Sequence, residues 1–120
     1  MAKSNMEVVL DCVEPQRLEA FWRAALGYRS LVSVEDIVVL VADNELSPPL
    51  LLQRVPEAKS GKNRMHIDIV GDDVEAEAAR LEALGARRVH DGLRSMGPVR
   101  WVTMADPDDN EFCVSTGVEW

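Results

Sequence analysis

Side chains that bind metals or move protons recur at alternating positions along several strand-like segments of this chain. His66 and Asp68, for example, alternate with Met65, Ile67 and Ile69. Because successive side chains of a strand point to opposite faces, the apolar residues would meet helices and the polar residues would share the other face. That face would collect Glu7, Asp11, Gln53, His66, Asp68, Glu111 and Cys113. Such a polar sheet face is typical of a wet pocket, in which imidazole, carboxylate and thiol groups could bind a divalent metal or transfer a proton.

The chain repeats one pattern in its two halves, and this repeat must position those residues. The first half runs from the strand-like Val8–Asp11 to a helical stretch that ends at Leu26-Gly27. The second half runs from Met65–Asp68 to a helical stretch that ends at Leu84-Gly85. Such self-similarity predicts two copies of one supersecondary unit that enclose a site between them.

Each copy is predicted to contain a strand, a helix and three further strands, which gives an α+β fold with a curved mixed sheet and helices on its outer face. Pro15 suits the first position of a helix, and Gly27 suits a left-handed cap at its end. Residues 91–97 are interpreted as a connection, residues 106–110 as a turn, and the polar residues 55–64 as a mobile linker.

We expect one domain, 1–120, with module 1 over about 5–54 and module 2 over about 65–116. Strands are predicted at 6–12, 28–34, 36–42, 50–54, from 65 onward, and at 86–90, 98–105 and 111–116, with helices over 15–26 and 74–84.

Composition limits the possible partners. The formal net charge of −8 disfavours nucleic acid and anionic membranes, because both require a basic face. Cys12 and Cys113 both lie in strand-like runs and are predicted to be buried thiols in a reducing compartment. The sequence opens with no recognisable signal peptide and has no apolar run that could span a bilayer, so we expect a cytoplasmic protein.

Several segments in this order resemble the vicinal oxygen chelate superfamily. They are Phe21-Trp22 before Leu26-Gly27, Met65–Asp68, Leu84–Ala86, and Asp106-Pro107 before Asn110–Phe112. The superfamily includes glyoxalase I, bleomycin and fosfomycin resistance proteins, methylmalonyl-CoA epimerase and extradiol dioxygenases, and the chain looks most like its small glyoxalase-like members. The resemblance implies two modules that form a cup, a homodimer, and a divalent metal that binds two adjacent oxygens of a small-molecule ligand.

The resemblance also implies which residues would hold the metal. The superfamily's ligand positions fall on His66, Gln53 and Cys113, and on either Glu7 or Val9, of which only Glu7 could bind a metal. This set suits Zn, Ni, Mn or Fe(II), and the cysteine favours zinc. The set departs from the pattern at Cys113, where a carboxylate is usual, so a site without metal stays an alternative. A second departure is Asp109, which stands where glycine is usual; aspartate tolerates the left-handed conformation, so we expect the turn to survive.

Each candidate residue also has a structural interpretation. His66 could be a ligand, a general base, or a histidine bonded to Asp68, and Glu7 could be a base or an ordinary edge carboxylate. Asp11 and Asp68 could hold the loops that follow them, and Cys113 could be a small buried hydrophobe.

The candidate ligand contacts are Trp101, Asp68, Glu111 and Trp22, although Trp22 lies on the apolar helix stripe typical of a core. Trp120 is interpreted as a dimer or packing contact, and the cations Lys59, Lys62 and Arg64 as either a gathering point for an anion or a solvated loop.

Two functions therefore stay open, beside a third possibility, a decayed module kept for dimerisation or regulation. In the first, the chain is a metal-dependent lyase, isomerase or epimerase in which Glu7 or His66 moves the proton. In the second, it is a metal-free binding protein of the bleomycin-resistance kind, with Trp101 stacking on the ligand and an acidic wall that suits a cation.

Overall fold

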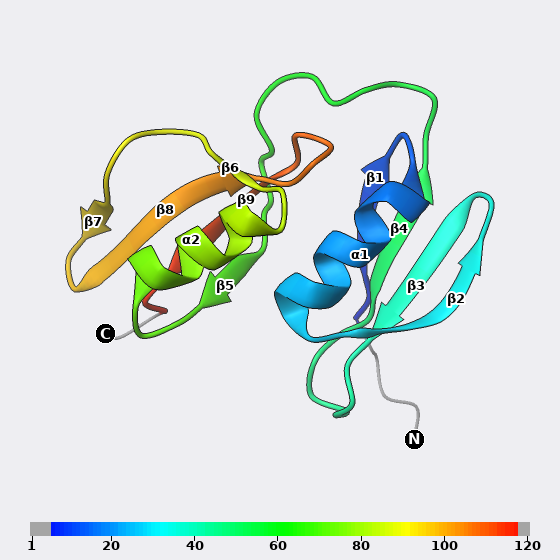
Figure 1. The fold of residues 1–120 in the computed structure, drawn as a ribbon, viewed down its shortest axis with the longest axis horizontal. Coiled ribbons are helices and arrows are strands. Elements are labelled where there is room, and N and C mark those ends of the chain that lie inside the picture. The colour runs from blue at the N-terminus through cyan, green and yellow to red at the C-terminus, as the bar shows by residue number, and fades with distance from the viewer. Residues whose placement is uncertain (1–5, 118–120) are drawn as a thin grey trace. The chain divides into compact units, whose positions relative to one another are not determined.

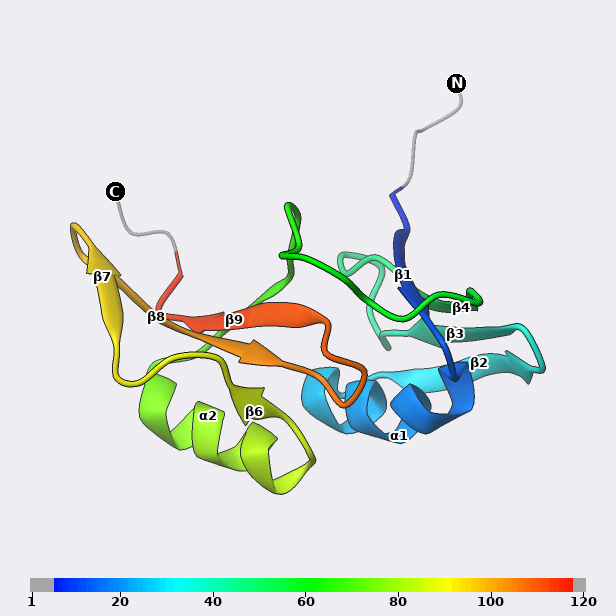
Figure 2. The same cartoon turned by 90° about the horizontal axis from the view of Figure 1, so that it is seen from above.

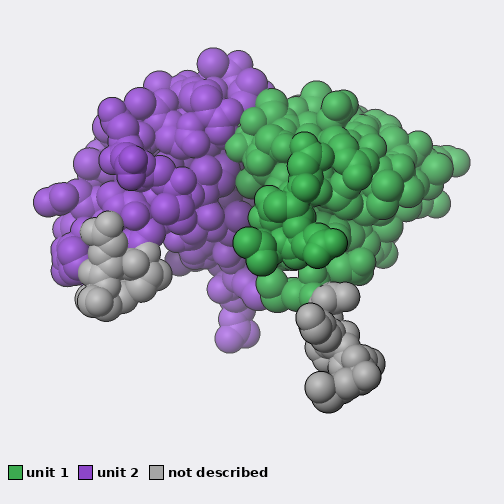
Figure 3. All heavy atoms as spheres, turned by 90° about the horizontal axis from the view of Figure 1, so that it is seen from below, with its two compact units in different colours: residues 1–58 green, residues 59–120 purple. Residues whose placement is uncertain are grey.

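The computed structural model describes residues 6–117, so Trp120 lies outside the described residues. The chain divides into two compact units, residues 1–58 (unit 1) and residues 59–120 (unit 2), which Figure 3 colours separately. Each unit contains one helix and one sheet of its own (Figure 1). No helix among residues 6–117 is both long and apolar enough to cross a membrane.

Unit 1 has the predicted order of one strand, one helix and three strands. These elements are β1 (Val8–Cys12), α1 (Pro15–Leu26), β2 (Arg29–Val34), β3 (Ile37–Val41) and β4 (Leu50–Arg54). In space the strands follow the order β1-β4-β3-β2, with β1 parallel to β4 and the other pairs antiparallel. The α+β class and the first module are therefore as the sequence predicts.

Helix α1 begins and ends where the sequence predicts and packs one apolar stripe on the sheet. Pro15 lies in its first turn, and Gly27 caps it in the left-handed region at φ 69°. Leu18, Phe21 and Trp22 are buried, and the two aromatic rings meet edge to face with centroids 5.1 Å apart. Trp22 is only 1% exposed, which confirms its core position and leaves no ring surface for a ligand in this unit.

Unit 2 repeats the same topology with one additional strand. It contains β5 (Asp68–Val70), α2 (Val74–Ala83), β6 (Arg87–Arg88), β7 (Arg94–Met96), β8 (Val99–Ala105) and β9 (Glu111–Ser115). The spatial order is β5-β9-β8-β6, and β7 pairs with β8. Parallel β5-β9 corresponds to parallel β1-β4 in unit 1.

Four sequence predictions were wrong in unit 2. The strand expected from Met65 begins at Asp68, because the chain bends at residues 64 and 65, and Met65 is 83% exposed. The strand expected at 86–90 spans only Arg87–Arg88, and residues 91–97, expected to be a connection, contain β7. Leu84, the last residue of the helix predicted over 74–84, follows the last turn of α2 and is 37% exposed.

The start of α2 was predicted correctly. The Asp73 carboxylate accepts a hydrogen bond from the Ala76 backbone N–H at 3.0 Å, a typical N-terminal cap. Val74, Ala78 and Leu81 form its buried face. Figure 2 shows that, in each unit, the helix covers one face of its own sheet.

Strand register in unit 2 divides the side chains between the two faces of the sheet. Residues directly opposite each other on paired strands share a face. Val102 and Val114 face each other, as do Met104 and Phe112, and all four are buried on the helix side. The rows on the other face pair Asp68 with Cys113, Cys113 with Thr103, and Trp101 with Ser115. The face without a helix therefore carries the chemistry-bearing side chains, as strand alternation predicts.

Candidate metal centre

The open face of the unit 2 sheet is hollowed into a cavity of about 400 Å³. His66, Asp68 and Cys113 contribute metal-binding atoms to its lining, and Trp101 contributes an indole ring. Apolar and polar side chains thus meet in one concavity, which is the usual composition of a small-molecule site.

His66, Asp68 and Cys113 form a cluster that we call the triad. Each offers one ligand atom, and these atoms lie within 4.8 Å of one another. The closest pair is His66 Nδ1 and Asp68 Oδ1, at 3.0 Å. The histidine and the aspartate are solvent-exposed, whereas Cys113 is only 6% exposed. The interpretation of His66 as a histidine bonded to Asp68 is therefore confirmed. Both side chains also lie near the Cys113 thiol.

Backbone pairing brings the triad together. Asp68 lies directly opposite Cys113 in the parallel β5-β9 pair. The ladder continues one step before β5, because the Cys113 N–H donates to the Ile67 carbonyl at 2.9 Å. His66 precedes that residue and lies two positions before Asp68, which puts both side chains on one face.

Burial governs the chemistry of Cys113. Desolvation raises the pKa of the Cys113 thiol, and the nearby Thr103 hydroxyl, 3.6 Å from the sulfur, only partly opposes this effect. Without a metal the group is therefore a protonated thiol at neutral pH, and a divalent ion would have to displace its proton. As the sequence predicts, both Cys113 and Cys12 are free buried thiols.

The donor atoms of the triad fit a soft or borderline divalent metal. Zinc takes imidazole, carboxylate and thiolate ligands in a tetrahedron, and catalytic zinc sites use three protein ligands and one open position. With bonds of about 2.0–2.1 Å, two donor atoms of such a tetrahedron are about 3.3 Å apart. The 3.0 Å separation of His66 Nδ1 and Asp68 Oδ1 is close to that value. Calcium and magnesium fit poorly, since they prefer more oxygen ligands than the triad supplies.

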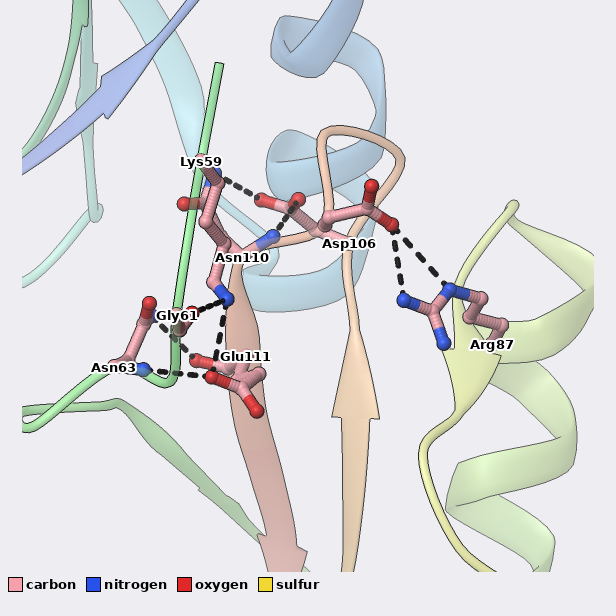
Figure 4. Close-up of polar contacts among 8 residues, drawn as sticks. Lys59, Gly61, Asn63, Arg87, Asp106, Asn110 and Glu111 are labelled. Carbon is pink, nitrogen blue, oxygen red and sulfur yellow. Dashed lines mark hydrogen bonds and ion pairs between the residues drawn. The ribbon is translucent and has the colours of Figure 1, made fainter. Parts of the chain in front are cut away.

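Glu111 anchors the chain segment that leads to the triad (Figure 4). Its carboxylate accepts a hydrogen bond of 2.7 Å from the Asn63 backbone N–H and lies 3.3 Å from the Lys59 ammonium. The Lys59 and Glu111 side chains are only 17% and 16% exposed. Lys59 also donates to the Gly61 carbonyl. The linker, expected to be mobile and solvated, is thus held against β9 from Lys59 to Asn63.

These contacts predict a pH-dependent contribution of Glu111 to stability. The Asn63 hydrogen bond, followed by Lys59, holds the pKa of Glu111 below its ordinary value of 4.5. A depressed folded-state pKa stabilises the protein above the unfolded-state pKa, and this stabilisation is lost as the pH falls through the folded-state value. Urea unfolding should show that Glu111→Gln is less stable than the wild type by about 1 kcal/mol at pH 7. At pH 3 the difference should be smaller; an equal difference at both values would show that Glu111 does not act through its charge.

The Asp-Pro turn before β9 keeps its shape despite its departure from the superfamily pattern. Asp109 adopts φ 66°, the left-handed conformation that the sequence predicts for this position. Asp106 is buried and accepts hydrogen bonds from the backbone N–H groups of Asp108 and Asn110, at 2.8 and 2.9 Å. Arg87 of β6 pairs with Asp109 at 3.0 Å.

The remaining predicted ligands lie in unit 1. Gln53 is opposite Asp11 in the parallel β1-β4 pair, and Glu7 lies just before β1. Glu7 lines a cavity of unit 1 with Met6 and residues 41–42 and 44–49, and Gln53 lines another with Asp36 and Ile37. The metal-binding and catalytic roles of Glu7 and the metal-binding role of Gln53 stay predictions.

The lining of the unit 2 cavity includes side chains that the sequence did not predict as site residues, among them three that carry charge or apolar bulk. Arg94 and Met96 reach the lining from β7, and Lys62 from the anchored linker. The signal that could have identified β7 is Gly97-Pro98, a turn dipeptide between two short runs that can pair as a hairpin. For Lys62 the sequence predicts only membership of a group of three loop cations that either gather an anion or are solvated.

Known proteins with this architecture support the assignment of the fold. A glyoxalase/bleomycin resistance protein/dioxygenase family enzyme from Burkholderia phytofirmans PsJN is 13% identical, with a TM-score of 0.76 over 91% of this chain and 94% of that chain. The fosfomycin resistance protein FosX from Listeria monocytogenes, solved with Mn(II) and a sulfate ion, is 17% identical, with a TM-score of 0.75 and coverages of 98% and 93%. Protein ATC0852 from Agrobacterium tumefaciens is 20% identical, with a TM-score of 0.79 and coverages of 98% and 100%. At these identities the similarity shows a shared fold.

Similarity in sequence is found at the level of the family. No curated protein matches the chain. The sequence pattern of the glyoxalase-like domain matches residues 7–115, which include both units' sheets and the triad. The chain therefore belongs to the glyoxalase-like domain family, within the vicinal oxygen chelate superfamily that its sequence resembles.

Proposed function

We propose that the cavity of unit 2 binds a small molecule beside one divalent metal held by the triad, as part of a lyase, isomerase or epimerase activity. The observation that carries this proposal is the cluster of three metal-binding atoms within 4.8 Å in a cavity that also contains an indole. Zinc is the favoured metal because of the Cys113 thiolate. The FosX structure contains Mn(II), which makes manganese the alternative to test here.

A metal at this position would act as a Lewis acid that polarises an oxygen of the bound molecule. The protein would supply orientation and shielding from water. The anchored linker would help to hold His66 near Asp68, the half-buried Thr103 hydroxyl lies 3.6 Å from the Cys113 sulfur, and Trp101 offers a flat surface to the ligand.

Metal content tests this function directly. Protein purified without an affinity tag should contain close to one equivalent of metal by elemental mass spectrometry. The His66→Ala variant should contain almost none and should keep the circular dichroism spectrum of the wild type. A wild type that stays metal-free after incubation with zinc and manganese and gains no thermal stability would contradict the proposal.

A second candidate function is metal-free binding of a small molecule in the same cavity. It is favoured by the direct 3.0 Å contact of His66 with Asp68 and by the raised pKa of Cys113, since both leave the triad satisfied without an ion. Binding of one ligand with equal affinity by chelator-treated and by zinc-loaded wild type would support this candidate over the first.

A further inference from the structure

The β7-β8 hairpin adds a cation to the cavity that contains the triad. Arg94 lies directly opposite Trp101, and Met96 directly opposite Val99. Because opposed residues share a face, these four side chains lie on the cavity side, where all of them contribute to the lining. Ser95 and Arg100 form the pair between them and point to the other face.

The charges that line the cavity do not cancel. Its charged side chains are Lys62, Arg94, Asp68 and Glu111. Glu111 is already balanced by Lys59, which lies 3.3 Å away. One negative charge, on Asp68, therefore remains against the positive charges of Lys62 and Arg94. A divalent ion bound by Asp68 and a Cys113 thiolate would be neutralised by them and leave both cations uncompensated. The cavity is thus electropositive with or without a metal, in a chain whose net charge is −8.

Within residues 6–117, the side chains of Lys62 and Arg94 make no hydrogen bond or ion pair, although the charge of Lys62 acts at longer range on Glu111. The Arg88 guanidinium on β6, by contrast, binds both Glu75 and Glu82. An arginine that faces a cavity with its donors unused can bind a carboxylate through two parallel hydrogen bonds. Beside it, Trp101, Met96 and Val99 form an apolar wall, and an indole ring favours a flat partner.

We infer that the ligand of this cavity is a small carboxylate attached to a flat apolar group, with Arg94 and Lys62 binding the anion and Trp101 packing on the apolar part. The inference rests on the proposal that this cavity is the ligand site. It differs from the cationic ligand that an acidic wall of the cavity would suit, because, with Glu111 balanced by Lys59, the charges that line this cavity are mostly positive. The hairpin supplies the specificity, because Arg94 and Trp101 come from its two strands.

The test compares three probes of the same shape: 2-naphthoate, 2-naphthamide and (2-naphthyl)methylammonium. Calorimetric titrations at low ionic strength are made on chelator-treated protein and again on zinc-loaded protein. We expect naphthoate to bind at least about tenfold more tightly than the amide, and the cation to bind most weakly, in both preparations. Arg94→Gln should remove most of the preference for naphthoate, and Lys62→Gln part of it.

Arg100→Gln is the matched control, because it removes the same charge from the same hairpin on the opposite face. It should keep the preference for naphthoate. Equal affinity for naphthoate and the amide, or no binding of any probe, would overturn the inference. A preference that appears only with zinc and survives Arg94→Gln would also overturn it, since the metal would then be the anion site. The chelator-treated protein could also prefer naphthoate to the amide while failing to take up zinc. That result would support the carboxylate ligand and contradict the metal part of the proposed function.

Discussion

Replacing His66 by alanine should lower the affinity for zinc by more than about a hundredfold. Loss of a group that only supports a metal ligand commonly lowers affinity by about 10- to 100-fold, and loss of a ligand should exceed that range. His66 Nδ1 is 3.0 Å from the Asp68 carboxylate, and a ring nitrogen of His66 lies within 4.8 Å of the Cys113 sulfur, so removal of the ring leaves two donors. The affinity can be measured by competition with a chromophoric chelator.

Two aspartate variants calibrate that measurement. Asp68→Asn removes the triad carboxylate and should lower zinc affinity by at least about tenfold. Asp72→Asn removes an exposed carboxylate that lies between β5 and α2 and does not line the cavity, so it should leave the affinity unchanged. If His66→Ala binds zinc as tightly as Asp72→Asn does, the triad is not the metal site.

Replacing Asp106 by alanine should lower the free energy of unfolding by about 2–4 kcal/mol. The Asp106 carboxylate is 2% exposed and accepts two backbone N–H groups and the Asn110 side-chain amide, the last at 3.3 Å. Hydrogen bonds to a charged group contribute about 1.5–3 kcal/mol each, and donors left buried without a partner add a penalty. Urea unfolding followed by circular dichroism gives the value.

The matched variants for Asp106 separate its hydrogen bonds from its charge. Asp106→Asn keeps one acceptor oxygen and should lose about half as much stability as the alanine variant. Asp91→Ala removes an exposed carboxylate of the same unit and should change stability by less than about 0.5 kcal/mol. A loss for Asp106→Ala no larger than that of Asp91→Ala would show that the turn does not depend on this carboxylate.

Strand alternation predicted the face that carries the chemistry, because its period of two needs no knowledge of distant partners. It correctly grouped His66, Asp68 and Cys113 opposite the helix-facing Ile69 and Val114. The buried stripe of α1, its left-handed Gly27 and the left-handed Asp109 were predictable for a similar reason, since each depends on local sequence.

Features that depend on long-range pairing were not predictable in the same way. Strand β7 is three exposed residues with no apolar alternation, and it forms only because β8 pairs with it. Lys59 and Glu111 are far apart in sequence, so nothing in the polar linker indicated that it would be anchored. The place of Asp68 in the triad was not predicted either, because the resemblance assigned the metal-ligand positions to other residues.

The absorption spectrum of the cobalt-substituted protein tests the central claim most directly, because cobalt(II) reports a thiolate ligand that zinc does not. The chelator-treated wild type should develop a thiolate-to-cobalt charge-transfer band that saturates at one equivalent, and Cys113→Ser should lose it. Cys12→Ser, which removes the other buried thiol, should keep the band. A band that survives in Cys113→Ser, or a wild type that shows no band at saturating cobalt, would contradict a metal centre built from His66, Asp68 and Cys113.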